Sequence, residues 1–213
     1  MSPDIFAFTV SALLILSYYL YLNRRSRFKP NSCVYSLNAT IRELWVHMVM
    51  QSDKKDILAI QTLRNSLMAA NFMASTAVLL IISSLSLSEK VGEWAGQFYS
   101  SSINHDIMIQ LWRIKLGLLL FDFSVAFFCF AMAVRFFNHV GYMINLPLDE
   151  SNHPLLAKQT IAYLNRAGIY YTRGTRTFFF SLPIIMWIFG PAFLMLTSLI
   201  LVGQLYILDK VSK

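Results

Sequence analysis

The stretch IKLGLLLFDFSVAFFCFAMAVRFF, residues 114–137, decides the fold class of this sequence. Three of its residues are charged: Lys115, Asp122 and Arg135. A transmembrane helix needs about 20 mostly apolar residues, because each residue advances it by about 1.5 Å through a hydrocarbon core of about 30 Å. The stretch meets that requirement, so it predicts a helix that crosses a membrane.

Three further runs have the same character, at residues 5–22, 67–87 and 178–208. Over the whole chain 56% of residues are hydrophobic and 14% are charged, against roughly 25% charged in soluble domains. We therefore expect one membrane domain over residues 1–213. Its class is an all-α integral membrane protein, a bundle of about four transmembrane helices with one or two cytoplasmic interfacial helices.

The positions of Lys and Arg predict the orientation of the four runs, because cytoplasmic loops of membrane proteins are enriched in these residues. Thirteen of the eighteen lie between the first two runs or flank the third and fourth on the same side. This predicts cytoplasmic loops at residues 23–64 and 138–177, with both termini outside the cytoplasm. We expect the inner membrane of a bacterium.

The two predicted loops contain signals for helices of their own. From Asn38 an apolar stripe follows helical spacing, which indicates a helix lying in the membrane interface or packed under the bundle. The stripe consists of Ile41, Leu44, Trp45, Met48 and Val49. Asp53 and Asp56 resemble a helix start, so the second run is expected to begin below the membrane and continue unbroken. Pro154 indicates another start.

The fourth run contains Pro183 and Pro191, each of which removes a backbone hydrogen-bond donor. We interpret Phe189-Gly190-Pro191 as a kink within one long helix rather than as a break. Kinks occur in transporters and in ordinary bundles alike, and the structural interpretation is preferred here.

The sequence has none of the common catalytic or nucleotide-binding motifs. Its four histidines, His47, His105, His139 and His153, lack the spacing of a helical metal site. We expect no catalytic activity, no metal and no cofactor. The net charge of +7 comes from basic residues beside apolar runs, which predicts contact with anionic lipid headgroups rather than nucleic acid.

Asp122 is the ionisable residue deepest in a predicted span, about 13 Å along it by the helical rise. Carboxyl groups at such depth usually face a partner or a pathway. Counting along the second run places Asn71 and Ser75 near the same depth, so we expect Asp122 to point into the bundle and to be hydrogen-bonded by them. A structural hydrogen bond and a proton-transfer role remain alternatives.

A band of basic and amide side chains is predicted at the cytoplasmic boundary. Its members are Arg64, Asn65, Arg135, Asn138, His139, Asn165, Arg166, Arg173 and Arg176. One interpretation is that these side chains extend to lipid phosphates and anchor the helix ends. The other is a buried network that closes the cytoplasmic face, with Asp53 or Asp56 as counter-charges and Arg135 close to the neighbouring helices.

Three of these stretches resemble a known family. They are DKKDILAIQTLRN at residues 53–65, FFC leading to RFFNH at residues 127–139, and LPIIMWIFGP at residues 182–191. The sequence resembles, over residues 39–209, the family catalogued as domain of unknown function 599, found in plants and bacteria. The resemblance implies a multi-helix membrane protein and implies nothing about activity.

Function therefore has to be predicted from physical features. We expect a non-catalytic multi-pass membrane protein, an accessory or structural subunit that packs against other membrane proteins or against copies of itself. The alternative is an oligomeric channel or transporter that uses Asp122 and the cytoplasmic arginines.

Overall fold

The described part of the chain consists of six helices, as the predicted all-α class requires. The structure is a computed structural model that describes residues 3–28, 34–51, 56–89, 105–146 and 153–210. The helices are α1 (Pro3–Phe28), α2 (Val34–Met50), α3 (Asp56–Glu89), α5 (His105–Ile144), α6 (His153–Phe189) and α7 (Pro191–Leu208). Within these residues four helices, α1, α3, α5 and α7, are long and apolar enough to cross a membrane. The protein is an integral membrane protein.

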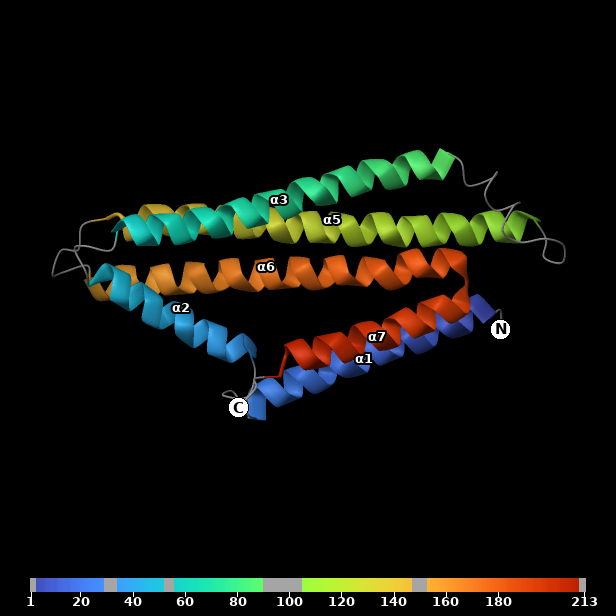
Figure 1. The fold of residues 1–213 in the computed structure, drawn as a ribbon, viewed down its shortest axis with the longest axis horizontal. Helices are drawn as coiled ribbons and strands as arrows, with labels where there is room; N and C mark the ends of the chain where they lie inside the picture. Colours follow the sequence, from blue (N-terminus) through green and yellow to red (C-terminus); the bar gives the residue numbers. More distant parts are fainter. Residues whose placement is uncertain (1–2, 29–33, 52–55, 90–104, 147–152, 211–213) are drawn as a thin grey trace.

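The long helices form an open row in the order α3, α5, α6, α7, α1 (Figure 1). The α5–α6 and α3–α5 contacts are the most extensive, α7 packs on α6, and α1 packs on α7. α3 and α1 are thus the edge helices, and each has one principal neighbour. In Figure 1 the α1–α7 pair also diverges from α6 with distance from the α6–α7 connection.

The α5 helix presents a continuous buried stripe to its neighbours, with the three- and four-residue spacing of one helix face. The stripe includes Trp112, Leu116, Leu119, Phe123, Ala126, Phe130, Ala133, Phe137 and Val140. On α6, Gly174 makes room for Phe130, because a Cβ atom there would lie 2.9 Å from the ring. Small residues of α3, Ala70, Ala74 and Ala77, are likewise buried.

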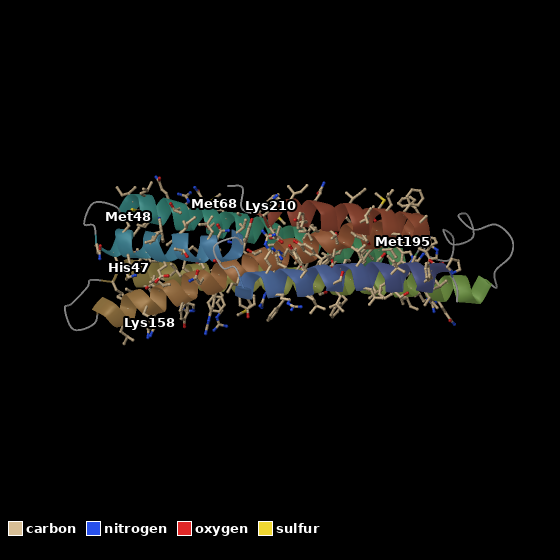
Figure 2. The ribbon with its side chains drawn as sticks, turned by 90° about the horizontal axis from the view of Figure 1, so that it is seen from below. His47, Met48, Met68, Lys158, Met195 and Lys210 are labelled. Atoms are coloured by element: carbon tan, nitrogen blue, oxygen red, sulfur yellow. The ribbon has the colours of Figure 1, made fainter. Side chains whose placement is uncertain are left out.

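The helices α3, α5 and α6 are longer than a bilayer is thick. The 34 residues of α3 and the 40 of α5 correspond to about 50 and 60 Å by the helical rise. Together with α2 they continue as a helical bundle past the ends of α1 and α7, with a core that includes Val46, Leu63 and Leu164. We call this the extended end. Figure 2 shows Lys158 and His47 there, whereas Lys210, after α7, lies near mid-length.

The segments predicted as cytoplasmic loops, residues 23–64 and 138–177, form much of the extended end, and their cytoplasmic location stays a prediction. These segments are mostly helical, as α2 and as continuations of α1, α3, α5 and α6. Apolar run length identifies only the part of a helix that matches the bilayer, so it did not predict that α5 continues past residue 137 or that α6 joins the start near Pro154 to the fourth run. The expected early start of the second run is confirmed, because α3 begins at Asp56 and is unbroken to Glu89.

The α2 helix packs on α6 with a different face from the predicted stripe. Val46 and Val49 are buried and Trp45 packs against the same core. Ile41, Leu44 and Met48 are exposed instead. The helix therefore packs against the bundle as one alternative expected, but the apolar residues of the stripe are divided between two faces.

The prediction of one kinked helix over residues 178–208 is wrong. The helix breaks at Gly190, α6 ends at Phe189, and α7 starts at Pro191 and runs back along α6 (Figure 1). Gly190 has φ 150° and ψ 162°, a backbone conformation that is essentially restricted to glycine. Pro191 suits the first position of a helix because its missing N–H needs no partner there. We call this side of the molecule the hairpin end.

The hairpin changes the relation between the two termini. Asp4 contacts Trp187 near the hairpin, whereas Tyr18 contacts Asp209 at the far end of α7. α1 and α7 therefore run side by side in the same direction, and the N- and C-termini lie at opposite ends of the pair (Figure 1). This arrangement places the start of α1 and the end of α7 at opposite ends of the pair, which does not favour the prediction that both termini lie on one side of the membrane.

Candidate functional site

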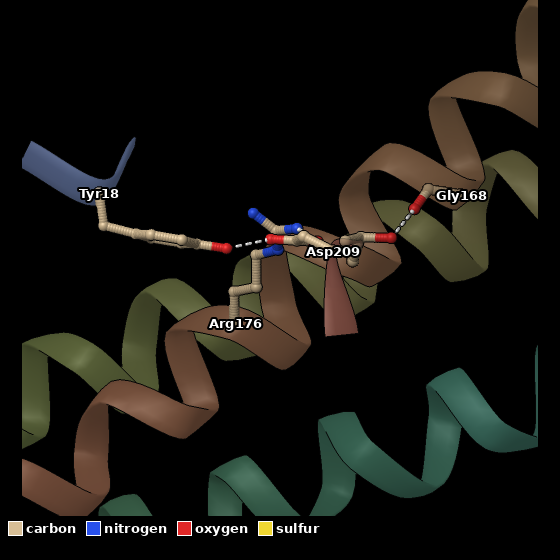
Figure 3. A network of polar contacts seen from close by, with 5 residues as sticks. Tyr18, Gly168, Arg176 and Asp209 are labelled. Carbon is tan, nitrogen blue, oxygen red and sulfur yellow. Dashed lines mark hydrogen bonds and ion pairs between the residues drawn. The ribbon is translucent and has the colours of Figure 1, made fainter. Parts of the chain in front are cut away.

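A polar cluster joins three helices where α1 and α7 end near the extended end. The carboxyl group of Asp209 accepts hydrogen bonds from the Tyr18 hydroxyl of α1 and from Arg176 Nη2 of α6, with which it also forms an ion pair (Figure 3). Asp209 caps the C-terminus of α7, where the helix dipole disfavours a negative charge. Arg176 offsets that charge, so the cluster fixes the end of α7 against α6 and α1.

A second contact ties α2 to α6. Arg42 Nε donates to Asn165 Oδ1 at 2.8 Å. Gly168, one turn further along α6, lets the guanidinium group lie against the helix, because a Cβ atom there would be 2.6 Å from Arg42 Nη1. Two members of the predicted band, Asn165 and Arg176, thus do take part in inter-helix contacts.

The predicted counter-charges, Asp53 and Asp56, are not tested by the described residues, and Arg135 does not take the predicted position. Arg176 pairs with Asp209; Asp53 and the side chain of Asp56 lie outside the described residues. Arg135 is exposed, and no ion pair or hydrogen bond to it is found within the described residues, so it does not join the network. Asn65, Asn138, His139, Arg166 and Arg173 are exposed as well. For this part of the band, lipid anchoring remains the interpretation.

Arg64 of α3 lines a groove between α3 and α5 at the extended end. The groove has a volume of about 280 Å³ and is shared with Asn138, Asn145 and Tyr142 of α5. Arg64 is exposed. The groove places one guanidinium and two amide groups together at the edge of the row, a combination suited to a phosphate oxygen.

Asp122 is buried in the helix row, as predicted, with 8% of its surface exposed. Its Oδ2 atom is buried and has no hydrogen-bond partner within the described residues. Asn71 and Ser75 do not reach it, so that part of the prediction is wrong. They lie one to two turns away along the α3–α5 contact, on the outer side of the row, where they line a groove with Phe127 and Ala131.

This second groove has a volume of about 570 Å³ and runs between α3 and α5 within the span. Asn71, Ala74, Ser75, Val78 and Leu79 form its α3 side, and Phe127, Ala131 and Val134 form its α5 side. Asn71 is exposed, and among the described residues no hydrogen bond to its amide is found. An amide group is therefore presented on the outer surface of an edge helix. We call this the Asn71 groove.

A third polar cluster lies at the hairpin end. Lys115 Nζ is 3.1 Å from Asp4 Oδ1 and donates to the Trp187 carbonyl oxygen at 3.0 Å. Trp187 Nε1 donates to the same Asp4 oxygen at 2.8 Å. In an α-helix this carbonyl would accept the N–H four residues later, but that residue is Pro191, which has none. The carbonyl instead accepts the Gly190 N–H at 3.2 Å, and Lys115 supplies a second donor.

Sequence reasoning missed the hairpin-end cluster and the role of Asp209. Asp4 and Lys115 are charged residues at the edges of apolar runs, and this position indicates that they need partners. Nothing in the sequence shows that two residues so far apart pair with each other. No group of three or more metal-ligating side chains that could hold an ion is found within the described residues.

Helices of membrane-spanning length, joined by polar clusters at both ends, define a multi-pass helical membrane protein. Residues 6–213 match the family described as "Protein of unknown function, DUF599", and the chain belongs to that family. No curated protein matches the chain. No solved structure matches it either.

Proposed function

We propose that this protein is a non-catalytic subunit of a membrane assembly and that it associates with its partner through the Asn71 groove. The observation that carries the proposal is the exposed Asn71 amide on the span of α3. Asn71 follows Arg64 by seven residues, which places it about 10 Å deeper in the membrane. Hydrocarbon offers no hydrogen bonds, so an amide at this depth is costly unless a partner satisfies it.

The groove also suits a close helix contact. Ala74, Ser75 and Ala131 are small, and small residues allow helix backbones to approach closely in membranes, where interhelical hydrogen bonds add stability. α3 is an edge helix. In its most apolar 18-residue stretch, only 11% of the residues are buried within the chain. The remainder is available to lipid or to another protein.

A second copy of this chain is the partner that the groove fits best. Two-fold symmetry about the membrane normal places Asn71 of one copy opposite Asn71 of the other at the same depth. An amide side chain is self-complementary, because it has both a donor and an acceptor. Arg64 lies two turns from Asn71, at the boundary, where anionic headgroups would separate the like charges of the two copies.

Oligomeric state tests this proposal, measured by native mass spectrometry after extraction in a mild detergent. We expect the wild type to be a dimer, and we expect Asn71→Leu to weaken dimerisation about three- to thirtyfold, since intramembrane polar contacts contribute roughly 0.6–2 kcal/mol. The matched control is Ser83→Leu, an exposed residue of α3 whose hydroxyl already bonds to the Leu79 carbonyl. Unchanged dimerisation of Asn71→Leu would overturn the proposal. A wild type that is monomeric without a bound partner would do the same.

We further propose that the extended end is cytoplasmic and that the hairpin end is outside, in the inner membrane of a bacterium. With the C-terminus at the extended end, fifteen of the eighteen Lys and Arg residues belong to segments on that side. Lys90, Arg113 and Lys115 are the three others. The charge bias is therefore stronger than in the orientation predicted from the sequence alone.

The second candidate function is an oligomeric channel or transporter. Asp122 favours it, because a buried carboxyl oxygen without a partner inside a span is a common feature of ion and proton pathways. Neither of the two grooves described above includes Asp122 in its lining, so we rank this function below the subunit.

A further inference from the structure

The groove that Arg64 lines between α3 and α5 combines one cation with amide, phenol and apolar side chains, and we call it the Arg64 groove. Its volume is about 280 Å³. Beside Arg64, its lining consists of Asn138, Gly141, Tyr142 and Asn145 and of the apolar residues Ile60, Leu63, Leu67, Phe137 and Ile144. None of these residues is acidic, so the guanidinium group is the one charge of the described lining.

The polar groups of the groove can still bind a ligand. Arg64 and Asn138 are exposed, and no hydrogen bond or ion pair of either side chain is found within the described residues. The Tyr142 side chain is 75% exposed. A guanidinium group holds a phosphate with two parallel hydrogen bonds, and an amide and a phenol can donate to the remaining oxygens.

Gly141 leaves space on the α5 side of the groove. A Cβ atom at Gly141 would meet no neighbouring atom within 4 Å, whereas one at Gly174 would lie 2.9 Å from Phe130. The absence of a side chain at Gly141 therefore makes room in the groove and not for a neighbouring helix. Within a helix, glycine is less stable than alanine by about 1 kcal/mol, and no packing contact offsets that cost here.

The level of the groove along α5 indicates where its phosphate comes from. Arg135 follows Lys115 of the hairpin-end cluster by twenty residues, or about 30 Å by the helical rise, which is the thickness of a hydrocarbon core. Asn138 and Gly141 come within two turns after Arg135. The groove thus lies in the layer that flanks the hydrocarbon, and this layer contains the headgroups of phospholipids.

We propose that the Arg64 groove binds the phosphate group of one anionic phospholipid, in the leaflet at the extended end. Arg64 donates to the phosphate, with Asn138 and Tyr142 as further donors. The glycerol and the first acyl carbons lie against Ile60 and Leu67. No described lining residue could pair with the cation of a zwitterionic headgroup, which favours an anionic lipid. This is a defined site for one lipid, and it does not rest on the Asn71 groove.

Titration of the purified full-length protein with phosphatidylglycerol tests the proposal, with native mass spectrometry in detergent to count the lipid molecules bound per chain. We expect phosphatidylglycerol to bind more tightly than phosphatidylcholine. Arg64→Gln should weaken this binding about ten- to a hundredfold, because hydrogen bonds to charged groups contribute roughly 1.5–3 kcal/mol. The matched control is Arg113→Gln, which removes an exposed cation of α5 outside the groove and should leave the affinity unchanged.

Gly141→Leu separates a defined site from general attraction to surface charge. The leucine side chain fills the groove from a position with open space around its Cβ atom, and it leaves every charge in place. We expect it to abolish the tight binding of phosphatidylglycerol. Gly117→Leu is the matched control, because Gly117 is an exposed glycine of α5 with the same open space and does not line the groove. Circular dichroism should show all variants folded.

Four results would overturn the proposal. The first is equal affinity of the wild type for phosphatidylglycerol and phosphatidylcholine. The second is equal affinity of Arg64→Gln and Arg113→Gln, because the groove would then be no more than part of a basic surface. The third is tight binding retained by Gly141→Leu. The fourth is displacement of the lipid by an equal concentration of inorganic phosphate, which would identify a free phosphate as the ligand.

Discussion

The buried carboxyl group of Asp122 destabilises the fold around it. Its neighbours on the buried face of α5 are Leu119, Phe123 and Ala126, and its Oδ2 atom has no partner within the described chain. A buried polar group without a hydrogen bond destabilises a fold by about 1–3 kcal/mol. Packing does not explain the presence of a carboxyl group here, which is why this residue supports the second candidate function.

The residue-scale prediction is that Asp122→Leu raises the midpoint of thermal unfolding in detergent, by an amount corresponding to about 1–3 kcal/mol. The physical reason is that an apolar side chain removes the unsatisfied carboxyl from an apolar face. Asp122→Asn is the matched control, since it keeps a polar group of the same size. A lower midpoint for Asp122→Leu would show that the carboxyl stabilises the fold. Asp122 would then no longer support the channel or transporter function.

At the scale of the elements, the α6–α7 hairpin depends on contacts from helices distant in the sequence. Gly190 provides the reversal, and because Pro191 has no N–H, the Trp187 carbonyl accepts from the Gly190 N–H and from Lys115 of α5. Asp4 of α1 then neutralises Lys115. The hairpin is thus stabilised by one cation that satisfies a carbonyl on α6 and a carboxylate on α1.

The element-scale prediction is that Lys115→Met lowers stability by on the order of 3 kcal/mol, measured as a shift of the thermal midpoint in detergent. Lys115 is only 3% exposed, so its loss leaves the Asp4 carboxylate without its cation, with only the Trp187 Nε1 donor remaining. Arg113→Met is the control, because Arg113 is an exposed cation on the same helix. Equal midpoints for the two variants would contradict a stabilising role for the cluster. Adding Asp4→Asn to Lys115→Met should restore part of the loss.

For the whole molecule, the row of helices has two different edges. α3 presents the Asn71 groove, whereas α1 is fixed at two levels, by Asp4 to α6 and α5 near the hairpin and by Tyr18 to Asp209 at the end of α7. The parallel course of α1 and α7 follows from these two contacts. The topology proposed above therefore includes α6 as a crossing in addition to the four apolar helices α1, α3, α5 and α7.

The whole-molecule prediction concerns topology in intact cells. With Cys33 and Cys129 replaced, a membrane-impermeant maleimide should label Ser101→Cys from outside and should not label Lys210→Cys until the membrane is opened. The reason is that Lys210 follows the end of α7 that lies opposite the hairpin, on the side of the extended end. Labelling of Lys210→Cys in intact cells would contradict the parallel pairing of α1 and α7.

The sequence by itself determined the fold class and most of the helices. Runs of apolar residues need no tertiary information, because transfer into hydrocarbon depends on composition and length. The predicted spans 5–22, 67–87 and 114–137 accordingly lie within α1, α3 and α5. The burial of Asp122 was also predictable, since an ionisable residue within a span avoids lipid.

Only the tertiary structure decided how the helices turn and which polar groups meet. Phe189-Gly190-Pro191 is compatible with a kink or a reversal, and the choice depends on α7 packing against α6 and α1. α6 lacks the apolar length of a span because Arg173 and Arg176 interrupt it, yet Arg176 is paired with Asp209 once α7 folds back. Counting residues along the predicted spans placed Asn71 at the depth of Asp122 and predicted a hydrogen bond between them. In the structure Asn71 instead lines a groove with Phe127 and Ala131. Such contacts join residues remote in the chain, and local pattern carries no information about them.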